Sequence, residues 1–164
     1  MSALLLVPDA GPLIALARAG LLHLPALFYS KVLVPGAVWS EVLRQPAADE
    51  QVRLQAALAA GQLHLASEPD EAQPVLRDTQ LGRGERAAIG LALAHRAQVL
   101  IDERRGRRAA AEAGLLVVGT IGLLVRARQL DLIGPVRPIV DALRASGYYL
   151  AASVTDPALA RIGE

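Results

Sequence analysis

Short, continuous apolar runs alternate along this chain with segments whose apolar residues recur at helical spacing. Unbroken runs of this kind are typical of parallel strands that are buried on both faces. Strands are expected at about residues 4–7, 31–34, 63–65, 99–101 and 116–118. Helices are expected from Pro12, after Gly36, at 47–60, from Gly84, and at 104–113, 121–128 and 136–145. The pattern predicts an α/β fold in which helices cover both faces of a parallel sheet.

The length of the chain predicts one domain, spanning residues 1–164. With 53% hydrophobic residues, 164 residues can bury one core but are too few for two typical domains. Polar residues, Pro or Gly interrupt every apolar stretch before the roughly 20 residues that a membrane span needs. The first residues, MSALLLVPDAGP, contain no basic leader, so we expect a cytoplasmic protein with no membrane segment. The absence of cysteine excludes a disulfide scaffold and thiolate chemistry.

Five acidic residues stand where strands meet helices. Asp9 follows the first apolar run, Glu41 lies on the helix after the second, and Glu85 lies in the first turn of the helix that begins near Gly84. Asp102 and Glu103 follow the run Val-Leu-Ile. Each has a simpler explanation by itself, as a turn residue, a solvated helical acid or a helix cap. Because the carboxyl ends of parallel strands share one edge, we expect the five side chains to converge there.

A convergent carboxylate cluster requires a cation or bound protons. Two carboxylates about 4 Å apart repel by roughly 4 kcal/mol at an effective dielectric constant of 20. Hard oxygen ligands, with no cysteine and no paired histidine spacing, favour Mg²⁺ or Mn²⁺. Other acids, among them Asp49, Glu50, Asp78 and Asp131, lie in polar contexts and are expected only to be solvated.

Arginines border the predicted cluster and are candidates for binding a phosphate backbone. The net charge is only +1, so a nucleic acid would have to be bound by a local basic patch. Arginine is also used for almost every basic position, so a solvated arginine face is the competing interpretation. The candidates are Arg83 and Arg86, which flank Glu85, and Arg104, Arg105, Arg107 and Arg108, which follow Glu103.

Three further residues receive weaker predictions. Thr120, after the last predicted strand, is expected to cap a helix, with orientation of a metal-bound water as the alternative. Tyr148 and Tyr149 are expected to pack or to contact a partner. Aromatic residues make up only 3% of the chain, which argues against a base-stacking platform.

At these residues the chain resembles a PIN domain, the nuclease fold of VapC-type toxins from bacterial toxin–antitoxin pairs. It is most similar to the branch that opens with an Asp-x-Gly-Pro-Leu-Ile pattern, here Asp9 to Ile14. The matching segments follow one another over most of residues 8–130: PDAGPLIALARAGLLHL, VLVPGAVWSEVL, LGRGERAAIGLALA and VLIDERRGRRAAAEAGLLVVGTIGLLVRARQL.

The resemblance implies a five-stranded parallel sheet, an RNA substrate, an antitoxin partner and a homodimer. It also implies that the metal-binding acids are Asp9, Glu41, Glu85 and Asp102, with either Asp102 or Glu103 as the last ligand. Our hypothesis is that Asp9 and one of these two bind Mg²⁺ or Mn²⁺ directly. Glu41 and Glu85 would complete the shell or position the attacking water.

Two alternative functions remain. Gly82, Gly84 and Ala87 follow a G-x-G-x-x-A order, which is a weak dinucleotide-binding signal unless a strand directly precedes it. The stronger alternative is a catalytically silent interaction module that has the same fold, because a fold does not determine a function.

Overall fold

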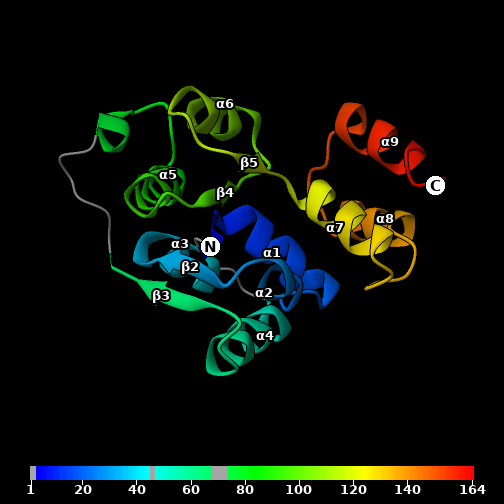
Figure 1. The fold of residues 1–164 in the computed structure, drawn as a ribbon. Coiled ribbons are helices and arrows are strands. Elements are labelled where there is room, and N and C mark those ends of the chain that lie inside the picture. The colour runs from blue at the N-terminus through cyan, green and yellow to red at the C-terminus, as the bar shows by residue number, and fades with distance from the viewer. Residues whose placement is uncertain (1–2, 45–46, 68–73) are drawn as a thin grey trace.

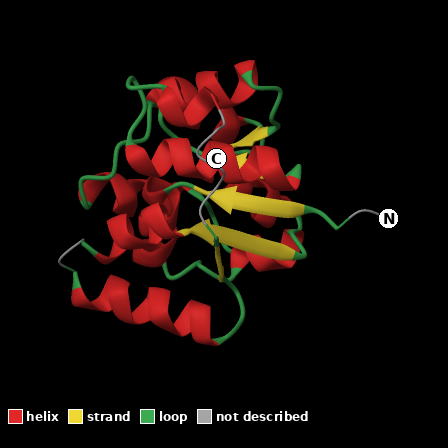
Figure 2. Ribbon diagram, turned by 90° about the vertical axis from the view of Figure 1, so that its left-hand side faces the viewer, coloured by secondary structure: helices red, strands yellow, loops and turns green. Residues whose placement is uncertain are grey.

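Five parallel strands form the centre of the protein, in the order β3-β2-β1-β4-β5 (Figure 1). The computed structural model describes residues 3–44, 47–67 and 74–164. The strands are β1 Leu5–Pro8, β2 Lys31–Pro35, β3 His64–Ala66, β4 Gln98–Leu100 and β5 Val117–Val118. All four pairings are parallel, and Figure 2 shows the visible strands running in one direction. The predicted fold class and the five strand positions are therefore confirmed.

Helices cover both faces of this sheet. Helix α5 crosses one face over β1, β2 and β4, while α1 and α7 lie on the other (Figure 1). The helices are α1 Ala10–Ala19, α2 Leu24–Phe28, α3 Gly36–Leu43, α4 Ala48–Ala59, α5 Arg83–His95, α6 Arg104–Glu112, α7 Thr120–Gln129, α8 Arg137–Ala145 and α9 Ala152–Ala160. Among the described residues, no helix is long and apolar enough to cross a membrane.

The core sits where the sequence predicted continuous burial. Beyond the first residue of each strand, the side chains of the three inner strands are buried, and Leu6, Val34 and Val99 are each at 0% exposure. The outer strands β3 and β5 are only partly buried. Inner strands buried on both faces explain why these runs are unbroken and apolar.

Several predictions about local structure are wrong. Helix α1 begins at Ala10, two residues before Pro12, because a proline in the first turn removes only an N–H that has no partner within the helix. The short helix α2 and the C-terminal helix α9 were not predicted. Glu50 is buried, and its Oε1 accepts a hydrogen bond from Arg18 Nε at 2.7 Å. Between β3 and α5, a short 3₁₀ helix η1 spans Pro74–Arg77, and residues 68–73 lie outside the described residues.

Strand register sets the geometry of the carboxyl edge. Pro8 is level with Leu100, and Leu100 is level with Val118. The backbone N–H of Asp9 then donates to the carbonyl of Leu100 at 2.9 Å, which extends the pairing by one residue. The residues that leave β1, β4 and β5 are therefore neighbours in space, although they are far apart in the sequence.

Candidate active site

A cleft of about 1340 Å³ opens at this carboxyl edge. Four of the five predicted acids line it: Asp9, Glu41, Asp102 and Glu103. The fifth, Glu85, is buried at 9% exposure and interacts electrostatically with Asp9 and Glu103. Asp9 and Asp102 thus face the same space, as convergence at one sheet edge requires. The structure does not test the catalytic roles of these residues, which stay predictions.

The Asp9 carboxylate does not cap the helix that follows it. It occupies the N-cap position of α1, yet its side chain makes no capping hydrogen bond. Burial raises the pKa of Asp9 to about 6, partly offset by the backbone N–H of Ala10 and reinforced by the charges of Glu41, Glu103 and Asp102. The carboxylate is therefore available to the cleft, where its ionised form needs a positive charge.

Glu85 has one oxygen engaged and one without a partner. Its Oε2 accepts a hydrogen bond from the backbone N–H of Gly82 at 2.8 Å, as expected for an acid in the first turn of α5. Its Oε1 is buried and has no hydrogen-bond partner in the described part of the chain. Burial raises the pKa of Glu85 to about 7, and the neighbouring Glu103 carboxylate adds to the effect. When Glu85 is ionised, its Oε1 therefore lacks a hydrogen-bond donor or a cation to compensate its charge.

Two glycines allow the carboxylates to come this close to the helices. A β-carbon at Gly84 would lie 2.5 Å from Glu41 Oε2 and 3.5 Å from Asp9 Oδ1. A β-carbon at Gly106 would lie 2.7 Å from Glu85 Oε1. A side chain at either position would therefore push the Glu41 or Glu85 carboxylate out of its place beside the helix.

Gly106→Ala is expected to destabilise the protein, although alanine is the better helix former. The new β-carbon would press on Glu85 Oε1 and lie 3.0 Å from Ile101 Cγ2, and such overpacking costs roughly 1–3 kcal/mol. Gly122→Ala in α7 is the matched control, because a β-carbon there meets no atom within 4 Å. The control should stabilise by up to about 1 kcal/mol. Urea unfolding measures both, and equal effects of the two changes would contradict the close approach.

Asp102 is fixed by three hydrogen bonds. Its Oδ1 accepts from the backbone N–H of Thr120 at 2.7 Å, and its Oδ2 accepts from Thr120 Oγ1 at 2.6 Å and Tyr148 Oη at 2.5 Å. Asp102 and Thr120 are therefore not N-caps: Gly119 is the N-cap of α7, and Glu103 is the N-cap of α6, without a capping hydrogen bond from its side chain. Thr120 is fully buried and orients Asp102 instead.

No local sequence pattern indicates that Tyr148 belongs to this cluster. Tyr148 follows α8 and lies 46 positions from Asp102 in the chain. Arg144 orders the segment beyond it by donating to the carbonyl of Leu150 at 3.2 Å and to Thr155 Oγ1 at 2.6 Å. Burial raises the pKa of Tyr148, and the charge of Asp102 raises it further, so the hydroxyl remains a donor. Only the packing of the C-terminal helices identifies this contact.

Tyr148→Phe is expected to loosen Asp102 while leaving the fold intact. Loss of an outer hydrogen bond to a metal ligand typically costs about 10- to 100-fold in metal affinity or activity. Mn²⁺ binding by electron paramagnetic resonance, with RNA cleavage alongside, measures the effect. Tyr149→Phe is the matched control, because the Tyr149 ring is 84% exposed. Equal Mn²⁺ affinity in the two variants would remove Tyr148 from the site.

The predicted substrate-binding arginines fall into two groups. Arg104 and Arg107 line the cleft, and Arg107 also donates to the carbonyl of Ile101 at 2.8 Å. Arg83, Arg86 and Arg105 are not among the residues that line it. Arg86 and Arg105 instead donate to the carbonyls of Leu76 and Gln80, which ties down residues 76–80, while Arg108 pairs with Glu112 on the surface.

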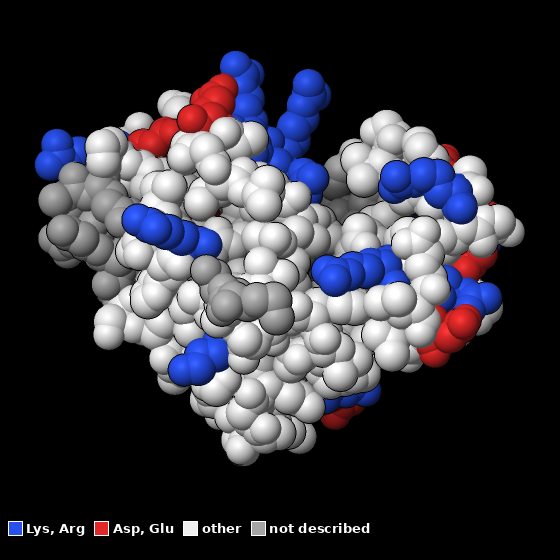
Figure 3. Space-filling model, viewed as in Figure 1, with Lys and Arg blue, Asp and Glu red and all other residues white. Residues whose placement is uncertain are grey.

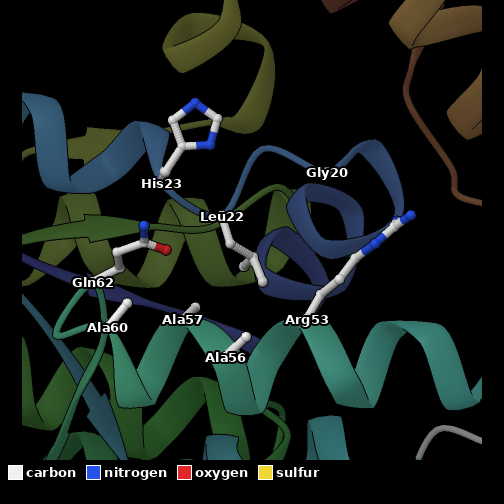
Figure 4. Close-up of a pocket in the computed structure, with 8 residues that line it drawn as sticks. All are labelled: Gly20, Leu22, His23, Arg53, Ala56, Ala57, Ala60 and Gln62. Carbon is white, nitrogen blue, oxygen red and sulfur yellow. The ribbon is translucent and has the colours of Figure 1, made fainter.

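A second hollow, of about 400 Å³, lies between α4 and the turn after α1 (Figure 4). Its lining includes His23, Arg53 and Gln62 together with small apolar residues, and no acidic side chain. Arg53 is already bonded to the carbonyls of Ala17 and Arg18. The hollow lacks convergent reactive groups, so the acidic cleft is the candidate active site.

The acidic residues suit a hard divalent cation in their chemistry. The available donors are carboxylate oxygens, one of them is buried without a partner, and crowding raises the pKa values of Asp9 and Glu85. Among residues 3–44, 47–67 and 74–164, however, no three acid or histidine side chains are grouped closely enough to hold a metal. The ligands would therefore have to move together on binding.

The dinucleotide-binding interpretation fails on context. Residues Gly82 and Gly84 are preceded by η1 and a turn, whereas that motif requires a strand directly before it. Gly84 instead lies where α5 passes the Glu41 carboxylate.

Comparison with known proteins agrees with this geometry. A family model described as "DUF3368: PIN domain" matches residues 5–164, which is nearly the whole chain. The chain belongs to the PIN-domain family. PIN domains are commonly nucleases and typically bind divalent metals. No curated protein matches this sequence.

Two solved structures share the PIN fold with this chain at low sequence identity. One is a PilT N-terminus domain protein, SSO1118, from the archaeon Sulfolobus solfataricus P2, with 16% identity and a TM-score of 0.56. That match covers 76% of this chain and 93% of the other. The other is PAE2754 from Pyrobaculum aerophilum, with 17% identity, a TM-score of 0.55, and coverage of 77% and 90%. At such identities the likeness concerns the fold alone.

Proposed function

We propose that this PIN domain is a Mg²⁺- or Mn²⁺-dependent endoribonuclease of the VapC-like branch, which hydrolyses RNA phosphodiester bonds. The observation that carries the proposal is the crowding of acids at one edge, with Glu85 Oε1 buried and unpaired beside them. Such an arrangement is costly unless a cation compensates it. The toxin role, an antitoxin partner and a homodimer belong to the same proposal and rest on the resemblance of residues 8–130.

The metal would be held by Asp9, by Asp102 or Glu103, and by Glu41 and Glu85. When bound, it lowers the pKa of a coordinated water and stabilises negative charge on the phosphate. Thr120 and Tyr148 keep Asp102 in one orientation, so less reorganisation is needed when the substrate arrives. Glu103 is exposed, whereas three hydrogen bonds fix Asp102, which favours Asp102 as the rigid member of the pair.

The remaining residues act on the substrate and the water. Arg104 and Arg107 contact the phosphate backbone from the α6 side of the cleft. Glu41 and Glu85 position a water whose oxygen attacks phosphorus as the bond to the 3′-oxygen breaks. The proton lost by the water is balanced by protonation of the leaving 3′-oxygen. The products are a 5′-phosphate and a 3′-hydroxyl, and no covalent enzyme intermediate is formed.

A silent interaction module is the second candidate. It is favoured by the absence of a ready group of three metal ligands among the described residues. It is also favoured by Asp102, whose oxygens already accept three hydrogen bonds. This candidate predicts that Mg²⁺ and Mn²⁺ leave the unfolding temperature unchanged, whereas a working site binds the ion and raises it.

The deciding experiment incubates the wild-type chain with single-stranded RNA in Mn²⁺, in Mg²⁺ and in EDTA. Cleavage is expected only with metal, and the fragments should carry 5′-phosphates that a phosphate-specific exonuclease recognises. Cleavage that persists in EDTA, or fragments with 2′,3′-cyclic phosphates, would rule out this chemistry. Intact RNA, together with no metal-induced stabilisation, would favour the silent module.

A further inference from the structure

The cleft extends well beyond the carboxylates. Its lining runs from Asp102, after β4, back to Gln98 at the first residue of that strand, where Tyr29 Oη donates to Gln98 Oε1 at 2.8 Å. These positions are about 13 Å apart at roughly 3.3 Å per residue. The volume of about 1340 Å³ exceeds the roughly 300–1,000 Å³ of a typical small-molecule pocket. The space suits a polymer better than a single small ligand.

Charge divides this cleft into two parts. All four acids that line it, Asp9, Glu41, Asp102 and Glu103, belong to the carboxyl edge. Two further arginines line it: Arg126 near the C-terminal end of α7 and Arg161 directly after α9. Figure 3 shows Lys or Arg side chains on both rims of the notch between the lobes that carry α6 and α9. The region away from the acids is therefore cationic, which suits a polyanion that extends past the reacting group.

The charges of Arg126 and Arg161 remain available to a ligand. The Arg126 guanidinium lies 4.4 Å from the centroid of the Phe28 ring, a contact that orients the charge without cancelling it. Within the described part of the chain, neither Arg126 nor Arg161 forms an ion pair with a carboxylate. Both side chains are exposed, so each can bind a phosphate without first breaking a salt bridge.

An exposed aromatic ring lies in the same cleft. Tyr149 is 84% exposed and lines the cleft between the fixed Tyr148 and the buried Leu150. A ring held on an ordered backbone with a free face can stack a base. Bases are available for such stacking in single strands, whereas a duplex keeps them stacked inside.

We infer that Arg126, Arg161 and Tyr149 form a binding subsite for single-stranded RNA, in which the arginines bind backbone phosphates and Tyr149 stacks a base. This inference rests on the proposed function, which places the scissile phosphate of the RNA at the carboxylates. Nucleotides to one side of that phosphate then occupy the subsite. An acidic polypeptide is the alternative occupant, and it would use the arginines without the stacking contact.

Binding of a fluorescently labelled, unstructured oligoribonucleotide to the full chain in EDTA tests the subsite in the absence of cleavage. Arg126→Ala and Arg161→Ala should each weaken binding about 3- to 10-fold and reduce the slope of log affinity against log salt by about 0.7. Tyr149→Ala should weaken binding about fivefold or more, with little effect on the salt slope, and Tyr149→Phe should retain affinity. Arg77→Ala is the matched control, since Arg77 is an exposed arginine of η1 outside the cleft and should leave binding unchanged.

Poly-glutamate competition and a cleavage assay separate the other outcomes. If Arg126→Ala and Arg161→Ala bind the RNA as tightly as Arg77→Ala does, the proposed subsite is ruled out. Displacement of the RNA by poly-glutamate at equal charge, with no effect of Tyr149→Ala, would assign the cleft to an acidic protein segment and overturn it as well. If the variants bind RNA as expected but the wild-type chain leaves RNA intact with Mn²⁺, the subsite stands and the proposed nuclease activity fails.

Discussion

Asp9→Asn is expected to reduce metal-dependent RNA cleavage by at least about 100-fold, even at saturating Mn²⁺. The substitution retains the size of the side chain but removes a negative charge from the acidic cluster. Asp9 makes no capping hydrogen bond in α1, and asparagine retains an acceptor oxygen for the backbone N–H of Ala10, so the helix should be little affected. Removal of a half-buried charge near Glu41, Glu103 and Asp102 should also leave the protein at least as stable without metal.

Asp131→Asn is the matched control for this measurement. Asp131 pairs with Arg128 on the surface, its side chain is 89% exposed, and its φ of 54° is one that asparagine tolerates. It should cleave RNA at the wild-type rate. Undiminished cleavage by Asp9→Asn would remove Asp9 from the chemistry, and with it the proposed metal site.

In EDTA, the free energy of unfolding is expected to fall by roughly 2 kcal/mol between pH 5 and pH 8. The pKa values of Asp9 and Glu85 are raised in the folded state, to about 6 and about 7, from 3.8 and 4.5. The folded protein therefore binds more protons than the unfolded chain in this range, and it loses stability as the pH rises through the folded pKa values. A full pKa difference of one unit would change the free energy of unfolding by about 1.4 kcal/mol. Partial exposure of Asp9 and water penetration reduce the change below this value.

Thermal unfolding at several pH values measures this slope, with an expected fall of about 4–8 °C in Tm. Millimolar Mg²⁺ or Mn²⁺ should recover much of the loss at pH 8, because the cation stabilises the ionised cluster. Asp9→Asn combined with Glu85→Gln should flatten the slope, whereas Glu112→Gln, at an exposed site on α6, should retain it. A wild-type slope of the opposite sign would show that the acids are not crowded in the folded protein.

The predicted strands were the most reliable part of the sequence interpretation because burial on both faces leaves a strong local pattern. Residues 31–34 and 99–101 were identified as strands without any knowledge of their neighbours, and the helix expected at 47–60 matches α4, Ala48–Ala59. Helices α2 and α9 escaped prediction because they are short or mixed in composition. Helix α9 also contains Pro157, which disfavours a helix, and it packs against α7.

The order of residues along the chain determined the α/β class, and with it that Asp9, Glu41, Asp102 and Glu103 would share one edge. In a parallel sheet, the carboxyl ends of all strands lie at the same edge, so the residues that follow them lie near one another. Only the tertiary structure decided how each carboxylate is partnered: Asp102 is fixed by Thr120 and Tyr148, and Glu85 is left with an unpaired oxygen. The Thr120 contact spans 18 positions and follows from the pairing of β4 with β5, and the Tyr148 contact spans 46 positions and follows from the docking of the segment after α8, so no local pattern encodes either.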